Sequence, residues 1–175
     1  MRLLLNYFLI IFVIFSANSN DLVWRIENIP NIGPFASING GVTWGDTLNI
    51  RPASQDCEFS EIFFSVYTTL GNKNIFDLKD KIIGTNFNSH NAGAKVISVN
   101  KFLLGHHLHL SYGMYPSEID FFKKVLFKNK KSISIKLIDA NEIIIDEYFD
   151  ISYNNWNISG FEEAYLEVLK LCNNN

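Results

Sequence analysis

Apolar and polar residues alternate with a period of two along many short segments of this 175-residue chain. β-branched and aromatic residues dominate these segments, and Gly and Asn lie between them, which is typical of β-strands joined by turns. So frequent a series of short strands favours an immunoglobulin-like β-sandwich over alternating strands and helices. The predicted strands cover residues 22–26, 43–52, 61–69, 94–104, 106–114, 132–139 and 142–151.

Two segments instead carry apolar residues at helical spacing. We predict a short helix near 117–127, directly after Pro116, because proline is common just before or within the first turn of a helix. We predict a second helix near 160–172, where Ser159 and Glu162 have the spacing of a capping box. Its apolar stripe should face the sheet. The stripe consists of Phe161, Ala164, Tyr165, Val168, Leu169 and Cys172.

The N-terminal segment has the layout of an export signal. Arg2 precedes an apolar run over 3–15, which is shorter than the roughly 20 residues that a membrane-spanning helix needs. Ala17 and Ser19 follow, spaced as the small residues before a signal-peptidase site. We therefore predict a signal peptide over 1–19. The remainder, 20–175, is expected to be a single exported domain in the periplasm or outside the cell, with no integral membrane segment.

The charge balance argues against nucleic acid as a partner. Fifteen basic residues, one of them in the predicted signal, face 18 acidic residues. Proteins that bind a phosphate backbone normally carry a basic excess. The one basic cluster, within 122–131, is interpreted as a solvated face.

The two cysteines, Cys57 and Cys172, predict a disulfide. An even number of cysteines in an exported chain usually pairs, and the stripe of the C-terminal helix directs Cys172 toward the sheet. The bond would tie that helix to an early strand. Closing a loop of over 100 residues contributes about 4–5 kcal/mol in the chain-entropy model.

The last third of the chain carries a recurring arrangement of elements. A short helix with basic residues at its end, "FFKKVLFKNKK", is followed by the strand "ISIKLID", the turn "ANE" and a further predicted strand. The segment "NISGFEEAYLEVLKLC" then opens a helix with Gly-Phe and an Ala one turn on. This third of the chain resembles small exported bacterial proteins of the invasion-associated locus B type. The resemblance implies a sandwich followed by a helix and a role at the cell envelope, and it carries over no catalytic residue.

Three of the four histidines lie in the stretch "GHHLHL". On a strand, His107 and His109 point to one face, a geometry in which two imidazoles can bind one Zn²⁺ or Cu²⁺. A site needs a third ligand, for which His90 is the first candidate. Behind it stand Asp46, Glu118 and Asp120. The alternatives are a solvent-exposed strand face and a pH sensor that titrates near pH 6–7.

Trp44 and Asp46, in "GGVTWGD", form a second candidate surface. An exposed tryptophan beside a turn can bind a partner, or it can pack in the core while the aspartate closes the turn. Asp146 and Asp150 would share a face of the strand predicted over 142–151. They are either a paired-carboxylate site or a solvated strand edge.

The chain contains no GxSxG, HExxH, Walker A or GxGxxG motif. We therefore expect a non-enzymatic envelope or secreted protein that binds another protein and needs no cofactor. The first alternative is a periplasmic zinc- or copper-binding protein that uses the H-x-H pair. The third reading is a hydrolase of unknown type. The binding reading predicts an exposed apolar patch or an unpaired edge strand.

Overall fold

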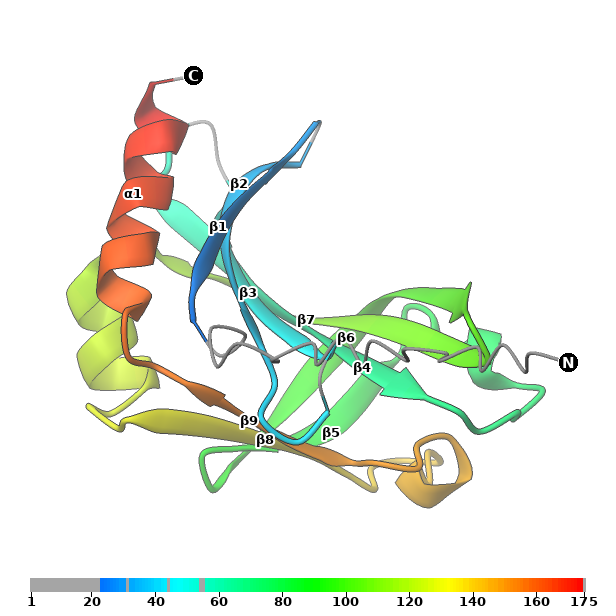
Figure 1. Ribbon diagram of the computed structural model, residues 1–175. Coiled ribbons are helices and arrows are strands. Elements are labelled where there is room, and N and C mark those ends of the chain that lie inside the picture. The colour runs from blue at the N-terminus through cyan, green and yellow to red at the C-terminus, as the bar shows by residue number, and fades with distance from the viewer. Residues whose placement is uncertain (1–22, 31, 44, 54–55, 175) are drawn as a thin grey trace, which may run out of the picture.

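A computed structural model of the chain describes residues 23–30, 32–43, 45–53 and 56–174, so the predicted signal peptide and Trp44 lie outside the described residues. Within these residues the strands form one antiparallel sheet, accompanied by one α-helix and short helical segments (Figure 1). The strands are β1 (Arg25–Ile29), β2 (Gly33–Asn39), β3 (Thr47–Pro52), β4 (Phe59–Thr68), β5 (Ile82–Phe87), β6 (His90–Phe102), β7 (Gly105–Pro116), β8 (Ser132–Ile138) and β9 (Tyr153–Asn157). The helical segments are η2 (Ile75–Leu78), η3 (Phe121–Leu126), η4 (Ile145–Glu147) and α1 (Phe161–Asn173).

The prediction of a mainly β chain is confirmed. The nine strands of the described residues belong to one sheet in the order β1-β2-β3-β4-β7-β6-β5-β8-β9, and neighbouring strands run antiparallel. The immunoglobulin-like type is not confirmed, because hydrogen bonds join the strands into a single sheet and not into two. β2, β5 and β9 were not predicted. β2 opens with Gly-Pro, and β9 reads "YNNWN", so neither has the composition of a typical strand.

The sheet is strongly curved, so that strands far apart in its order meet across the core (Figure 1). The ring centroids of Phe64 in β4 and Trp156 in β9 lie 6.4 Å apart. The backbone N–H of Gly41 donates to the carbonyl oxygen of Asn155 over 2.8 Å, and the indole of Trp24 donates to the carbonyl oxygen of Asn157 over 3.0 Å. Both Trp24 and Trp156 are therefore core residues that help to hold the two ends of the sheet together.

The predicted strand over 142–151 is wrong. This segment contains the 3₁₀ turn η4, and its backbone makes only an isolated bridge between Ala140 and Ile143 in the described residues. Ile145 and Phe149, four residues apart, are the buried positions, which is a helical rather than a strand spacing. Asp146 and Asp150 therefore do not share a strand face. The Asp150 carboxylate instead accepts hydrogen bonds from the backbone and the hydroxyl of Thr69.

Both predicted helices are present, but the predicted capping box is wrong. The segment near 117–127 forms η3, a short π-helical segment whose Phe122 is buried. α1 begins at Phe161 with Gly160 at the N-cap, in the left-handed conformation (φ 81°) and without a side-chain cap. Ser159 thus lies one residue too early to cap the helix. Among the described residues, no helix is long and apolar enough to cross a membrane.

The disulfide between Cys57 and Cys172 is confirmed. The two Cα atoms lie 6.3 Å apart across a sequence separation of 115 residues, within the usual range for this bond. It ties the last turn of α1 to the connection between β3 and β4. At this loop length the chain-entropy model gives a stabilisation of about 4–5 kcal/mol.

Candidate functional site

The histidine stretch forms the start of β7. Leu108 and Leu110 are fully buried on its inner face, while His107 and His109 share the outer face with their ring centroids 4.8 Å apart. Burial, together with the neighbouring His109, lowers the pKa of His107 to about 4. Burial also lowers the pKa of His109. His107 therefore titrates well below the pH 6–7 range that a sensor of neutral pH requires.

The structure does not bring a third metal ligand to this pair. In the described part of the chain, no group of three or more His, Cys, Asp or Glu side chains could hold a metal ion. His109 pairs with Ser98 of β6. His90 is the first residue of that strand, eight residues before Ser98, which places it roughly 25 Å from Ser98 at about 3.3 Å per residue. His90 is therefore not part of an H-x-H site.

The second predicted surface is divided by the structure. Trp44 lies outside the described residues, and Asp46 is buried, with only 1% of its surface exposed. Its carboxylate accepts hydrogen bonds from the backbone N–H of Tyr67 (2.8 Å) and the side-chain amide of Asn154 (3.2 Å). Burial raises the pKa of Asp46 to about 7, and the two hydrogen bonds act in the opposite direction. Asp46 thus connects the β2–β3 loop to β4 and β9 and is not an exposed binding residue.

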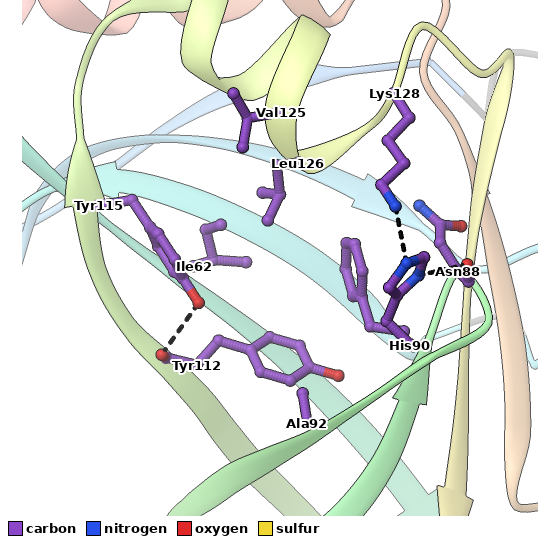
Figure 2. Close-up of a pocket in the computed structure, with 10 residues that line it drawn as sticks. Ile62, Asn88, His90, Ala92, Tyr112, Tyr115, Val125, Leu126 and Lys128 are labelled. Carbon is purple, nitrogen blue, oxygen red and sulfur yellow. Dashed lines mark hydrogen bonds between the residues drawn. The ribbon is translucent and has the colours of Figure 1, made fainter.

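His90 instead lies at a pocket between η3 and the β5–β6 hairpin (Figure 2). Apolar and aromatic side chains form its walls, and its volume is about 240 Å³. Drug-sized ligands usually occupy about 300–1,000 Å³, so this pocket fits one ring or a short chain. The described lining residues are Ile62, Phe87, Asn88, His90, Ala92, Tyr112, Tyr115, Val125, Leu126 and Lys128.

Nitrogen atoms gather at one end of this pocket (Figure 2). The Nζ of Lys128 lies 2.8 Å from the Nε2 of His90, and the Nδ1 of His90 lies 3.1 Å from the carbonyl oxygen of Asn88. Because a carbonyl oxygen only accepts, Nδ1 must carry the imidazole proton, which leaves Nε2 to accept from the lysine. Asn88 contributes a third nitrogen, which Figure 2 shows turned toward the end of the pocket where Lys128 and His90 meet.

That third nitrogen, the Nδ2 of Asn88, is buried and has no hydrogen-bond partner among the described residues. The orientation of the amide is set by its other end, because Oδ1 accepts the backbone N–H of Ser134 over 3.1 Å. The side chain cannot turn its donor away from the pocket without losing that bond. A buried amide donor without a partner costs about 1–3 kcal/mol, so such a group in a native fold calls for a physical explanation.

The local sequence explains why an asparagine occupies this place. Phe87 pairs with His90, so that Asn88 and Ser89 form a two-residue hairpin turn. Both have positive φ, 49° and 73°, as the tight turns that suit the twist of a hairpin require, and Asn tolerates this conformation best after Gly. Phe87 is buried, so the turn is anchored on the core. The partner of the Asn88 amide oxygen, Ser134, comes from β8.

The titratable side chains of the pocket lining are those of His90, Lys128, Tyr112 and Tyr115. The described lining residues include no carboxylate, serine or cysteine. The hydroxyl of Tyr112 donates to the Oγ1 of Thr85 over 2.9 Å, and burial raises its pKa above the usual range. The phenol thus stays protonated and bonded within the protein. The arrangement can bind an apolar group that carries a hydrogen-bond acceptor.

A second exposed feature lies at the turn between β6 and β7, here called the apolar tip (Phe102, Leu103 and Leu104). Phe102 pairs with Gly105 across a two-residue turn, where Gly or Asn is the usual residue. Leu103 instead has positive φ (50°) and is 79% exposed, and Leu104 is 93% exposed. Leucines exposed to this degree add no buried apolar area to the fold. A positive φ at a leucine is backbone strain, which often occurs at functional sites.

Two side chains of the histidine stretch contact aromatic rings at or near the apolar tip. The rings of Phe102 and His107 lie 6.0 Å apart, and Phe76 of η2 contacts His106 edge-on at 5.3 Å. A side chain at Gly105 would clash with the carbonyl oxygen of Thr68. The "GHHLHL" stretch therefore combines a glycine that allows close packing with imidazoles that contact two exposed aromatic rings.

Comparison with known proteins adds no relative. No protein-family model, no curated protein and no solved structure matches this chain. The resemblance of the C-terminal third to the invasion-associated locus B type therefore stays a prediction from the sequence, and the function has to be argued from the side chains.

Proposed function

We propose that the chain is an exported, non-enzymatic binding protein whose ligand occupies the pocket between η3 and the β5–β6 hairpin. The observation that carries this proposal is the buried, unpartnered Nδ2 of Asn88 beside Lys128 and His90. A ligand acceptor would complete the hydrogen bonding of Asn88 and remove the cost of its buried donor. Export is supported by the disulfide, since such bonds persist in oxidising compartments. The contact of β4 with β9 across the core supports the sandwich-like description of the curved sheet.

The lining defines the chemistry of the ligand. Ile62, Tyr112 and Leu126 offer an apolar surface, so the body of the ligand is one ring or a short alkyl chain. At the other end stand the ammonium group of Lys128 and the amide donor of Asn88. These groups favour an anion such as a carboxylate, because hydrogen bonds to a charged acceptor are about twice as strong as neutral ones. When the anion binds, the ammonium group of Lys128 leaves the Nε2 of His90 and contacts the anion instead, and the exposed His90 side chain can then bond to water.

The test compares small carboxylates with uncharged molecules of the same shape. Benzoate and hexanoate are titrated calorimetrically into the protein beside benzyl alcohol and hexanol. We expect saturable binding of a carboxylate, together with a higher melting temperature because the ligand binds only the folded state. The alcohols should bind at least tenfold more weakly. Equal binding of acid and alcohol, or no saturable binding of either acid, would contradict the proposal.

A matched pair of substitutions locates the binding site. Asn88→Asp keeps the oxygen that accepts from Ser134 but removes the Nδ2 donor and adds a negative charge, so carboxylate binding should be lost. Asn141→Asp makes the same chemical change at an exposed asparagine that also has positive φ (55°) and that lies outside the lining. Binding should survive in this control.

Binding of another protein, which the sequence predicts, remains a second candidate function. The apolar tip favours it, because exposed apolar groups of this kind mark interaction sites. A photo-cross-linking amino acid at position 104 should capture one partner in the cells that make the protein. The same group at Leu166 of α1, another exposed leucine, serves as the control. Two results would reject the apolar tip as the binding site. One is equal capture of the partner from positions 104 and 166. The other is unchanged capture from position 104 when Leu103 is replaced by Asn.

A further inference from the structure

β1 is an edge strand of the sheet. It stands first in the strand order and pairs only with β2 in the described residues. A strand in this position presents a row of backbone N–H and C=O groups on its outer side, which another strand can pair with. Ile26 is 43% exposed, and Ile29 is also exposed. α1 contacts β1, β2 and β3, so it covers the face of this part of the sheet and does not extend its edge.

The charges on this edge are arranged in a self-complementary order. β1 reads "RIENI", with Arg25 and Glu27 on one face and Ile26 between them on the other. When two such strands run antiparallel with Ile26 opposite Ile26, Arg25 stands directly opposite Glu27 in both directions. Opposite charges at directly facing positions stabilise an antiparallel pair, and like charges destabilise it.

We propose that two copies of the chain pair antiparallel through β1, with the two-fold axis passing between the two Ile26 residues. Arg25 of one copy then meets the partner's Glu27, and Glu27 meets the partner's Arg25. Within one chain the guanidinium of Arg25 donates to the Oδ1 of Asn39 over 2.9 Å, and its Nε lies 3.6 Å from Glu27. The Arg25 and Glu27 side chains are both over 40% exposed, so a facing strand can reach them. The contact uses the same patch on both copies and closes as a dimer.

The opposite edge of the sheet is less suited to this pairing. β9 reads "YNNWN" and carries no charge, so it offers no partner for Arg25 or Glu27. The β2–β3 loop also lies against it, through the hydrogen bond from Gly41 to Asn155. A contact of β1 with β9 of another copy would be head-to-tail and would form rings or open chains instead of a two-fold dimer. The charges and the occupied edge both favour β1 with β1.

In this register three residues of each β1, Arg25, Ile26 and Glu27, face one another. The interface is small, so we expect a dimer whose population depends on protein concentration. Sedimentation velocity over a wide concentration range should show exchange between monomer and dimer. Ile26→Lys puts two ammonium groups opposite each other at the axis and should raise the dissociation constant at least tenfold. The control is Ile97→Lys on β6, because Ile97 is exposed to a similar degree, 41% against 43%. It should leave the dissociation constant unchanged.

Charge exchange tests the register itself. Arg25→Glu alone makes all four facing charges negative, and Glu27→Arg alone makes them positive, so each should weaken the dimer. The double variant Arg25→Glu/Glu27→Arg restores opposite charges at every facing position and should recover most of the lost affinity. Circular dichroism checks that each variant is folded. A protein that stays monomeric at all concentrations, a similar loss with Ile97→Lys, or no recovery in the double variant would overturn the proposal.

Discussion

Asp46 and Asn88 are both buried polar side chains at turns of this sheet, yet their hydrogen bonding differs. Both carboxylate oxygens of Asp46 have donors, Tyr67 and Asn154, and its backbone oxygen accepts from the indole of Trp156 over 3.3 Å. Asn88 has a partner for its oxygen and none for its nitrogen among the described residues. A fully bonded buried group stabilises the fold, whereas an incomplete one leaves hydrogen-bonding capacity for a ligand.

The positions of the two residues fit this difference. Asp46 joins the β2–β3 loop to β4 and β9, which are not neighbours in the sheet order. Its bonds therefore help the sheet to keep its curvature. Asn88 lies at a two-residue turn on the edge of a pocket. Its bond to Ser134 orients the amide and joins the end of β5 to β8, which is already its neighbour in the sheet. We infer that the Asp46 region determines stability and the Asn88 region determines binding.

The largest effect should come from removing the disulfide. Cys57→Ser/Cys172→Ser should lower the free energy of unfolding by about 4 kcal/mol, because the unfolded chain is no longer restrained by a long covalent loop. Urea denaturation measures this loss. Carboxylate binding by the fraction that remains folded should be unchanged, since neither cysteine lines the pocket. Loss of binding in a folded variant would show that the two regions are coupled.

Removing the carboxylate of Asp46 should come next. Asp46→Ala leaves the N–H of Tyr67 without its partner and removes one of the two hydrogen bonds that the Asn154 amide donates, so we expect the free energy of unfolding to fall by about 3 kcal/mol. Asn88→Gly keeps the positive φ of its turn and loses one hydrogen bond, which should cost about 1 kcal/mol. Urea denaturation of both variants gives the comparison directly. Equal losses would remove the distinction between the two regions.

The pH dependence of stability should separate Asp46 from the histidine pair. The folded-state pKa of Asp46 is about 7 against an ordinary value of 3.8, so the folded state binds more protons between these values and stability falls as pH rises through them. The folded-state pKa of His107 is lowered to about 4 from 6.5. Its contribution is present above pH 6.5 and is lost as pH falls toward 4. Between about pH 4 and 6.5, the Asp46 effect lowers stability with rising pH and the His107 effect raises it.

Substitution should reveal each effect alone. Asp46→Asn should leave a protein whose stability increases from pH 4 to 6.5, and His107→Gln one whose stability decreases from pH 4 to 7. The Asp46 effect extends over the window between pH 3.8 and about 7, and each pKa unit in it corresponds to about 1.4 kcal/mol of stability. Urea denaturation at a series of pH values measures these slopes. An unchanged slope in Asp46→Asn would contradict the buried, titrating carboxylate.

The smallest expected change concerns the stability of the pocket variant. Asn88→Asp keeps the Ser134 hydrogen bond and a residue type that tolerates positive φ, so its free energy of unfolding should change by about 1 kcal/mol or less. Its carboxylate binding should nevertheless disappear. Thermal unfolding with and without benzoate measures both quantities in one experiment. A large loss of stability would place Asn88 beside Asp46 as a structural residue.

Much of the fold follows from local sequence, because the signals are local. The alternation "HLHL" in β7 predicted which side chains are buried, and the apolar stripe of α1 predicted the direction of Cys172. The segment 142–151 misled because its run of isoleucines also suits a 3₁₀ turn with Ile145 and Phe149 inward. β-Propensity depends on the neighbours that a strand finds, and here Ala140 and Ile143 find only each other.

The pocket at Asn88 and His90 could not be predicted from local sequence patterns. His90 was selected as a metal ligand because of its residue type, and its position eight residues along β6 from the partner of His109 follows only from the strand register. The donor of Asn88 matters because Ser134, 46 residues away, occupies its acceptor. Burial of Asp46 depends on Tyr67 and Asn154, which the chain brings together from separate strands. The cysteine pair could be predicted because each cysteine has a specific chemical partner, whereas the hydrogen bonds of Asn88 and Asp46 join segments whose residue types do not identify one another.

The disulfide also divides the chain into a ring and an arm. The covalent ring runs from Cys57 to Cys172 and contains β4 to β9, whereas β1 to β3 lie outside it. In an oxidised but unfolded chain, the ring already shortens the search for contacts among six strands, and the arm has no such help. Opening of the native sheet should therefore begin in the arm, so that amide hydrogens of β1 exchange sooner than those of β7.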